Sequence, residues 1–233
     1  MNALDVSAVT FSYGNGAINA LEKFSLSVPD GGMHALLGPN GAGKSTLMRI
    51  ITGQLKGYSG SVAVYGRTIP DRDALLSIGY VPQPISLYTG LTAMENLRFF
   101  GAMAGMPADR IGARALEVLE RTGLAGHARE LVSTYSGGMQ RRLNIAVALL
   151  HSPTLLLLDE PTVGIDPQSR HHIYETLAEL NAAGMTVLLS THIMEEAQRL
   201  CRAVTMADKG LVIYEGPMSG IDNLEKFFLE KTG

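Results

Sequence analysis

The sequence contains little cysteine and no excess of charge of either sign. Cys201 is the one cysteine among 233 residues, which excludes an internal disulfide framework and suits a reducing compartment. We expect it to be a small buried hydrophobe and not a reactive group. The 19 Lys and Arg against 22 Asp and Glu give a net charge of −3, without a basic block. We therefore expect no nucleic-acid partner.

Long apolar runs are also absent. The longest are residues 145–150 and 155–158, whereas a helix that crosses a membrane needs about 18 apolar residues or more. Met1–Asp5 shows neither the basic start nor the apolar core of a signal peptide. We therefore expect a chain without a membrane span or a secretory leader. Such a chain can still bind to a membrane protein.

An octapeptide at Gly38–Ser45, GPNGAGKS, fits the phosphate-binding pattern G-x-x-x-x-G-K-[ST]. Its glycines let the backbone wrap around an anion, so that several N–H groups point inward. Lys44 adds a charge that reaches terminal phosphates, and the hydroxyl of Ser45 can ligate Mg²⁺. The alternative is a glycine-rich turn with an incidental lysine. The residues expected to bind the nucleotide here are Gly38, Pro39, Asn40, Gly41, Ala42, Gly43, Lys44, Ser45 and Thr46.

The segments around this loop alternate between predicted strands and helices. Residues 4–28 alternate apolar and polar positions, which favours antiparallel strands. Residues 155–158 are typical of a buried parallel strand, and Asp166 followed by Pro167 predicts the start of a helix. The expected strands are 33–37, 60–66, 77–81, 155–158, 185–190, 203–207 and 211–214, and the expected helices are 46–52, 166–183 and 193–201.

Residues from about 84 to 153 show a different, mostly helical pattern. Thr92 and Glu95 have the spacing of a capping box at the start of one helix. Pro107 suits the first turn of a second helix, whose apolar side includes Leu116, and a third helix is expected over 136–151. We expect a single domain over residues 1–233, made of an α/β core with an antiparallel β subdomain at 1–83 and 154–217, a helical subdomain at 84–153 and a C-terminal tail at 218–233.

Two carboxylates follow the apolar run at 155–158. Ligands collect at the carboxyl ends of strands in open α/β sheets, so Asp159 is placed to be a ligand of Mg²⁺. Glu160 is placed to orient or deprotonate an attacking water. Many strands simply end in charged residues, but together with Lys44 and Ser45 the pair predicts a hydrolytic site.

A second anion-binding helix start is predicted at Ser136-Gly137-Gly138. A hydroxyl and two glycines open the helix expected over 136–151, and the N-terminus of a helix favours anions. One nucleotide does not need two such receptors from the same chain. We therefore predict that this receptor serves the nucleotide of a second subunit; the alternative is an ordinary N-capped helix.

Together these motifs resemble the nucleotide-binding subunit of ATP-binding cassette (ABC) transporters, over nearly the whole chain and in that family's order. Gly38–Ser45 resembles the Walker A loop, Leu155–Glu160 resembles Walker B, and Ser136–Gly138 resembles the signature motif that other phosphate-loop ATPases lack. The resemblance implies an α/β P-loop NTPase fold with a mixed, mostly parallel sheet. It also implies ATP and Mg²⁺ as cofactors, with Lys44 among the catalytic residues.

Four weaker matches fall where the family would have them. Tyr13 resembles the aromatic residue that stacks on adenine, and Gln83 resembles the Q-loop glutamine, which also contacts the metal. Asp166 resembles the D-loop aspartate, and His192 resembles the switch histidine that hydrogen-bonds the γ-phosphate. Each has a plainer alternative: an aromatic residue in a strand, a loop residue between prolines, a helix cap and a structural histidine.

The signature departs from its commonest form. Met139 follows the glycine pair where the family most often has glutamine, and Gln140 comes next. Ser136 and both glycines are retained, so phosphate recognition is expected to survive. The Ser-Gly-Gly-Met form and the tail at 223–233 resemble exporters of drugs and polysaccharides.

The resemblance implies a mechanism with two copies facing head to tail. Each ATP would lie between Lys44 of one copy and Ser136 of the other, and hydrolysis would open the dimer. An integral membrane transporter subunit is expected to dock on the helical subdomain after Gln83. The chain is then expected to lie in the cytoplasm, peripheral on the cytoplasmic face of the cell membrane, and to drive transport, most resembling export.

Two other functions remain open at this point. One is a soluble ABC ATPase with an assembly or ribosome-associated role, although tandem cassettes and long coiled coils typical of some such proteins are absent. The other is a small-molecule phosphotransferase that uses the same loop. Co-purification with an integral membrane protein, or phosphate release without an acceptor, would separate these functions from transport.

Overall fold

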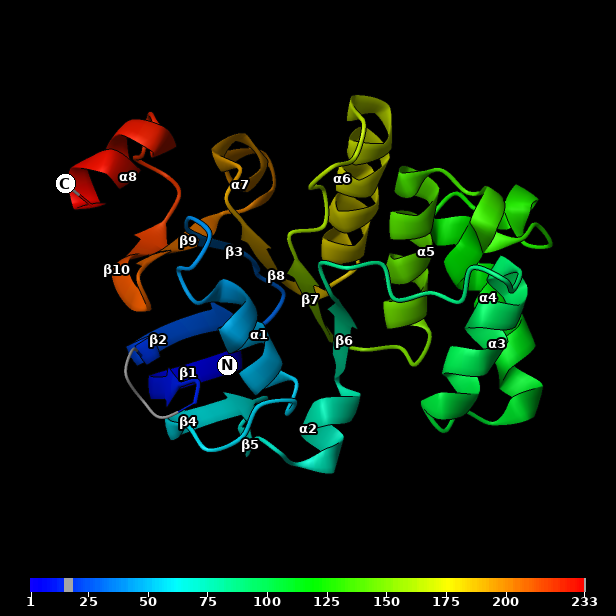
Figure 1. Cartoon of the computed structure of the whole chain (residues 1–233), viewed down its shortest axis with the longest axis horizontal. Helices are drawn as coiled ribbons and strands as arrows, with labels where there is room; N and C mark the ends of the chain where they lie inside the picture. The colour runs from blue at the N-terminus through cyan, green and yellow to red at the C-terminus, as the bar shows by residue number, and fades with distance from the viewer. Residues whose placement is uncertain (15–18, 233) are drawn as a thin grey trace.

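The computed structural model describes residues 1–14 and 19–232, and these residues form two β-sheets with helices around them (Figure 1). Gly233, the last residue of the predicted tail, lies outside the described residues. The first sheet has the strand order β2-β1-β4-β5 and is antiparallel. The antiparallel strands predicted within 4–28, of which 15–18 lie outside the described residues, and the strand predicted at 60–66 are therefore confirmed. Its strands are β1 Asn2–Ser12, β2 Asn19–Pro29, β4 Ser59–Val64 and β5 Arg67–Thr68.

The second sheet has the order β10-β9-β3-β8-β7-β6, and all its neighbours are parallel except β10 and β9. Every residue of the three central strands is buried, as expected where helices or a second sheet cover both faces. The mixed, mostly parallel α/β fold predicted from the sequence is confirmed. The strands are β3 Met33–Leu37, β6 Ile78–Val81, β7 Leu155–Asp159, β8 Thr186–Thr191, β9 Ala203–Asp208 and β10 Leu211–Pro217.

Alternate residues of the central strands enter two different cores. Leu155 and Leu157 of β7 pack in one cluster with the antiparallel sheet and with α1 Lys44–Ile51. Leu156 and Leu158 pack in the other cluster, with α5 Gly137–Leu149, α6 Pro167–Ala182 and α7 Met194–Leu200. This alternation is the period of two that a strand imposes on its side chains. Helix α1 therefore lies between the two sheets, and α5, α6 and α7 cover the opposite face of the second sheet (Figure 1).

The helical segment between β6 and β7 contains α3 Ala93–Met103, α4 Ala108–Arg121 and α5 Gly137–Leu149, which pack on one another (Figure 1). Thr92 caps α3 in the predicted capping box with Glu95. Two details of the prediction were wrong. Pro107 is the N-cap of α4 and not a residue of its first turn, and Leu116 is 55% exposed and does not join the packed side.

The other α-helices are α2 Arg72–Leu76, α6 Pro167–Ala182, α7 Met194–Leu200 and α8 Leu224–Thr232, and two short 3-10 helices lie at Ala125–His127 and Val132–Thr134. The sequence did not predict α2, nor α8 within the tail. Leu224 and Phe228 lie four residues apart in α8 and both are buried, which is the apolar spacing of a helix. The single-domain division predicted above stays a prediction.

Candidate functional site

The loop between β3 and α1 has a backbone that requires glycine at two positions. Gly41 and Gly43 have φ angles of +87° and +95°, a region that other residues rarely adopt. A Cβ on Gly43 would also lie 2.6 Å from the carbonyl oxygen of Ala20. Gly43 is the N-cap of α1 and provides no side-chain cap. The first N–H groups of α1 are therefore available to an anion.

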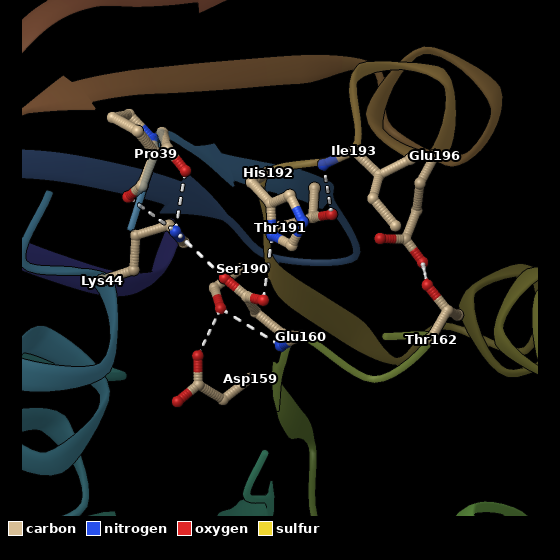
Figure 2. Close-up of polar contacts among 11 residues, drawn as sticks. Pro39, Lys44, Asp159, Glu160, Thr162, Ser190, Thr191, His192, Ile193 and Glu196 are labelled. Carbon is tan, nitrogen blue, oxygen red and sulfur yellow. Dashed lines mark hydrogen bonds and ion pairs between the residues drawn. The ribbon is translucent and has the colours of Figure 1, made fainter. Parts of the chain in front are cut away.

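Lys44, the first residue of α1, extends back over the loop that precedes it. Its side chain is buried, and Nζ donates to the carbonyl oxygens of Gly38 at 2.7 Å and Pro39 at 3.1 Å. Nζ also lies 3.1 Å from Oε1 of Glu160, and this carboxylate is buried as well. Figure 2 shows Lys44 between the loop and Glu160.

Glu160 follows directly after β7, at the edge of the sheet where β3, β7 and β8 all end. Its N–H donates to the carbonyl oxygen of Ser190 at 3.0 Å, and its φ of +49° turns the chain sharply away from the strand. Oε2 lies 2.9 Å from Nδ1 of His192 (Figure 2). The Glu160 carboxylate thus contacts both Lys44 and His192, and the three residues come from three different segments of the chain.

Asp159 is held by a residue that sequence reasoning missed. Asp159 is the last residue of β7 and pairs with Ser190 of β8 in register. The Ser190 hydroxyl donates to Oδ1 of Asp159 at 2.5 Å and accepts from the N–H of Glu160 at 3.3 Å. Ser190 therefore orients both carboxylate residues. The run 185–190 predicts a strand, but nothing in the sequence states which residue of that strand faces Asp159.

Two adjoining cavities collect most of the predicted nucleotide residues. One, of about 380 Å³, is lined by Tyr13, Ala20, residues 40–46, Gln83 and Glu160. The other, of about 510 Å³, is lined by Ser45, Gln83 and Asp159 among others. Ser45 and Gln83 contribute to both cavities, so they lie at the boundary between the glycine-rich loop and Asp159.

The three predicted metal ligands fit a hard divalent cation. Ser45, Gln83 and Asp159 line the second cavity together, and they offer a hydroxyl, an amide oxygen and a carboxylate, which are the donors that Mg²⁺ prefers. Within residues 1–14 and 19–232 no group of three or more His, Cys, Asp or Glu is placed to hold a metal ion. A hydroxyl, an amide oxygen and a carboxylate are hard oxygen donors, and such a set suits Mg²⁺.

Tyr13 stands at the rim of the first cavity. Its ring is half exposed and packs edge-on against Phe11, with 5.0 Å between ring centroids. Its hydroxyl lies 3.2 Å from the Thr46 hydroxyl, on the first turn of α1. An exposed aromatic ring fixed beside the phosphate loop offers a face on which a planar base can stack.

Ser136, Gly137, Gly138 and Asp166 line neither of these two cavities. Ser136 is the N-cap of α5, and its hydroxyl accepts from the N–H of Met139 at 3.2 Å. Asp166 caps α6 by accepting from the N–H of Ser169, and this hydrogen bond lowers the pKa of Asp166. A Cβ on Gly138 would overlap Ser169. The N-termini of α5 and α6 therefore lie together, and the structure does not join Ser136 to Lys44 within one chain.

A buried contact behind the site also went unnoticed in the sequence. The Thr162 hydroxyl donates to Oε1 of Glu196 at 2.7 Å (Figure 2). Glu196 is 1% exposed, and burial raises the pKa of its carboxyl group. This hydrogen bond connects the loop after Glu160 to the helix after His192.

Among the described residues, none of the helices is long and apolar enough to cross a membrane.

Comparisons with known proteins agree with this geometry. A family model described as "ABC transporter" matches residues 21–163. The linearmycin resistance ATP-binding protein LnrL of Bacillus subtilis (strain 168) is 46% identical over 215 residues, covering 91% of this chain and 68% of that protein. The Nod factor export ATP-binding protein I of Rhizobium meliloti (strain 1021) is 45% identical over 216 residues, covering 92% of this chain and 64% of that protein.

This chain thus spans 68% and 64% of the lengths of these two relatives. A solved structure is similar as well: a dimeric ATP-binding cassette, MJ0796, in a post-hydrolysis state bound to ADP and Pi. It is 30% identical, with a TM-score of 0.81 over 93% of this chain and 99% of that one. The chain therefore belongs to the ABC transporter family, as an ATP-binding cassette that hydrolyses ATP.

Proposed function

We propose that two copies of this chain hydrolyse Mg-ATP between them and drive export through an integral membrane partner. The observation that supports this most strongly is the run of contacts from Lys44 through Glu160 to His192 at the edge of the sheet. These side chains meet beside the glycine-rich loop, where phosphates would bind. The names of the two relatives, for export and for resistance, favour export over import.

Each residue of the site then has a role. The loop amides and Lys44 bind the phosphates, and Tyr13 stacks on the base. Glu160 orients and deprotonates the attacking water, while His192 holds Glu160 and donates a hydrogen bond toward the γ-phosphate. Ser45, Gln83 and Asp159 supply the oxygen atoms that would hold Mg²⁺, which would neutralise charge on the phosphates.

A second copy completes the site. Ser136 and the start of α5 line neither cavity around Lys44, yet the helix start is itself an anion receptor. Head-to-tail pairing would bring Ser136 and Asp166 of one copy onto the nucleotide held by Lys44 of the other. ATP then joins the two copies, and hydrolysis releases them.

The dimer is tested by replacing Glu160 with glutamine, which keeps the size of the side chain. We expect E160Q to bind ATP, to lose turnover and to accumulate as a dimer in Mg-ATP on size-exclusion chromatography with light scattering. The same variant with Lys44→Ala added should stay a monomer. A monomeric E160Q chain that is saturated with Mg-ATP would contradict the paired site.

The membrane partner is expected on an exposed apolar surface that we call the α3 patch: Tyr88, Phe99 and Met103. These side chains are 50%, 38% and 72% exposed, and the rings of Tyr88 and Phe99 are 4.8 Å apart. Exposed apolar clusters of this kind mark docking sites. Docking there would place the chain on the cytoplasmic face of the membrane.

Affinity purification from membranes tests this docking. We expect an integral membrane protein to co-purify with the wild-type chain and to be lost from F99S and M103S. Leu116→Ser is a matched control, because Leu116 is also exposed but lies on α4. If a soluble assembly factor or ribosomes co-purify instead, the transport function is wrong and a soluble ABC role replaces it.

A further inference from the structure

Arg141, on the second turn of α5, contacts the segment that carries Gln83. Its guanidinium donates through Nη1 to the carbonyl oxygen of Pro82 at 2.7 Å and through Nη2 to that of Gln83 at 2.5 Å. These residues are 58 and 59 positions apart in the sequence. The planar fork of an arginine can hold two neighbouring carbonyls at once, which the single ammonium group of a lysine cannot match.

Arg141 is buried without a carboxylate partner. Its side chain is 4% exposed, and among the described residues no Asp or Glu is within ion-pair distance of it. Burial lowers the pKa of Arg141, and the negative charge of Asp159 opposes this shift. Burying a charge is costly unless its hydrogen bonds are made. The carbonyls of Pro82 and Gln83 accept from its two Nη groups, while its buried Nε has no partner among the described residues.

Gln83, whose carbonyl Arg141 contacts, lies at the predicted nucleotide site. Gln83 lines both cavities, with Lys44 on one side and Asp159 on the other. Its backbone carbonyl is held by Arg141, so the direction of its side chain depends on α5. Ser136 is the N-cap of the same helix and lies about one and a half turns before Arg141.

We propose that Arg141 is a positioning residue that fixes Gln83 in the nucleotide site and links it to the helix start at Ser136. This inference rests on the proposed function, because it assigns Gln83 to Mg-ATP. Arg141 itself touches neither substrate nor metal. It holds the backbone on which Gln83 stands, so a movement of α5 is passed to Gln83 through two hydrogen bonds.

The next residue offers a matched control. Arg142 donates through Nη1 to the carbonyl oxygens of Thr122 and Gly123 at the end of α4, at 3.1 and 3.2 Å. It thus makes the same kind of contact from the same helix, and burial lowers its pKa too. Its partners lie outside both cavities. Replacing Arg142 with lysine therefore costs a similar carbonyl contact without releasing Gln83.

The experiment compares wild type, R141K and R142K as full chains. Each is labelled with ¹⁵N-glutamine, and the backbone amide of Gln83 is assigned among the five glutamines by its loss in Q83N. In R141K we expect the order parameter of Gln83 to fall from about 0.85 to below about 0.6. In R142K it should stay at the wild-type value. A rigid Gln83 in R141K would overturn the proposal.

Activity and binding give the second readout. We expect kcat for Mg-ATP to fall about tenfold in R141K, because a charge-assisted contact is lost, while binding of a fluorescent ATP analogue in EDTA stays within about twofold. R142K should match wild type in both. Equal kcat losses in R141K and R142K would show a general packing effect and contradict the proposal.

Failure of the R141K variant to fold and failure of the proposed function can be told apart. If R141K does not fold, R141M is measured in the same way, and failure of both variants beside a folded R142K would mean a purely structural role and overturn the inference. If wild type binds ATP but releases no phosphate, the proposed function fails. The order parameter of Gln83 still decides the role of Arg141 in that case.

Discussion

Replacing Glu160 with glutamine is the sharpest perturbation of the site. Glu160 contacts Lys44 at 3.1 Å and His192 at 2.9 Å, and both carboxylate contacts would become contacts with a neutral amide of the same size. Because Glu160 is the proposed base, hydrolysis should fall by about 10²–10⁴-fold, which is the usual contribution of a general base.

The effect on stability can be worked from the same distances. Opposite unit charges 3.1 Å apart attract by about 5 kcal/mol at an effective dielectric constant of about 20, and burial of the two ions offsets several kcal/mol of this. Lys44 keeps its hydrogen bonds to Gly38 and Pro39 in the variant. We therefore expect E160Q to lose about 1–3 kcal/mol of unfolding free energy and to remain folded.

Phosphate release under saturating Mg-ATP and urea unfolding measure the two effects. Glu196→Gln is the control, because it also changes a buried carboxylate to an amide but contacts Thr162 and not Lys44. We expect E196Q to keep hydrolysis within about threefold of wild type, since Glu196 does not face the cavity around Lys44. Hydrolysis by E160Q within tenfold of wild type would refute the assignment of the base.

Three other predictions concern the fold that carries the site. Burial lowers the pKa of His34 from 6.5 to about 4, so the unfolded chain binds this proton more tightly and stability falls as the pH falls. From pH 7 to 5, wild type should lose about 2 kcal/mol more than H34Q in urea unfolding, and an equal loss would contradict this. Gly43→Ala, with its Cβ 2.6 Å from the Ala20 oxygen, should abolish binding of a fluorescent ATP analogue and lower Tm by about 5 °C or more; wild-type affinity would count against the strained loop. Thr92→Ala removes the capping box of α3 and should cost about 1 kcal/mol in thermal unfolding, whereas an unchanged Tm would mean that the cap is dispensable.

The sequence predicted the sheet and the phosphate loop well, because both depend on local patterns. Runs such as Leu155–Leu158 are apolar throughout and can only be buried on both faces. The loop at 38–45 has glycine at Gly41 and Gly43, where the backbone has positive φ. Since ligands collect at the carboxyl ends of parallel strands, Asp159 and Glu160 were expected to lie with Lys44 and Ser45 in one site.

Contacts that depend on register or on distant packing were not predicted. Ser190 reaches Asp159 because β8 pairs with β7 in one register, and a shift of one residue would remove it. Arg141 meets the carbonyl of Gln83 across 58 positions in the sequence, which no local pattern records. The short helix α2 and the terminal helix α8 have weak periodicity, and their packing decides their structure.

Mixing two inactive variants tests the central claim that each nucleotide lies between two copies. Lys44→Ala removes the phosphate lysine, and Ser136→Glu places a negative charge at the start of α5. Each chain alone should release no phosphate from Mg-ATP. An equimolar mixture should recover about a quarter of wild-type activity, because half of the randomly paired dimers are mixed and each of these has one complete site. A mixture that stays inactive, or a Ser136→Glu chain that is fully active alone, would contradict the shared site.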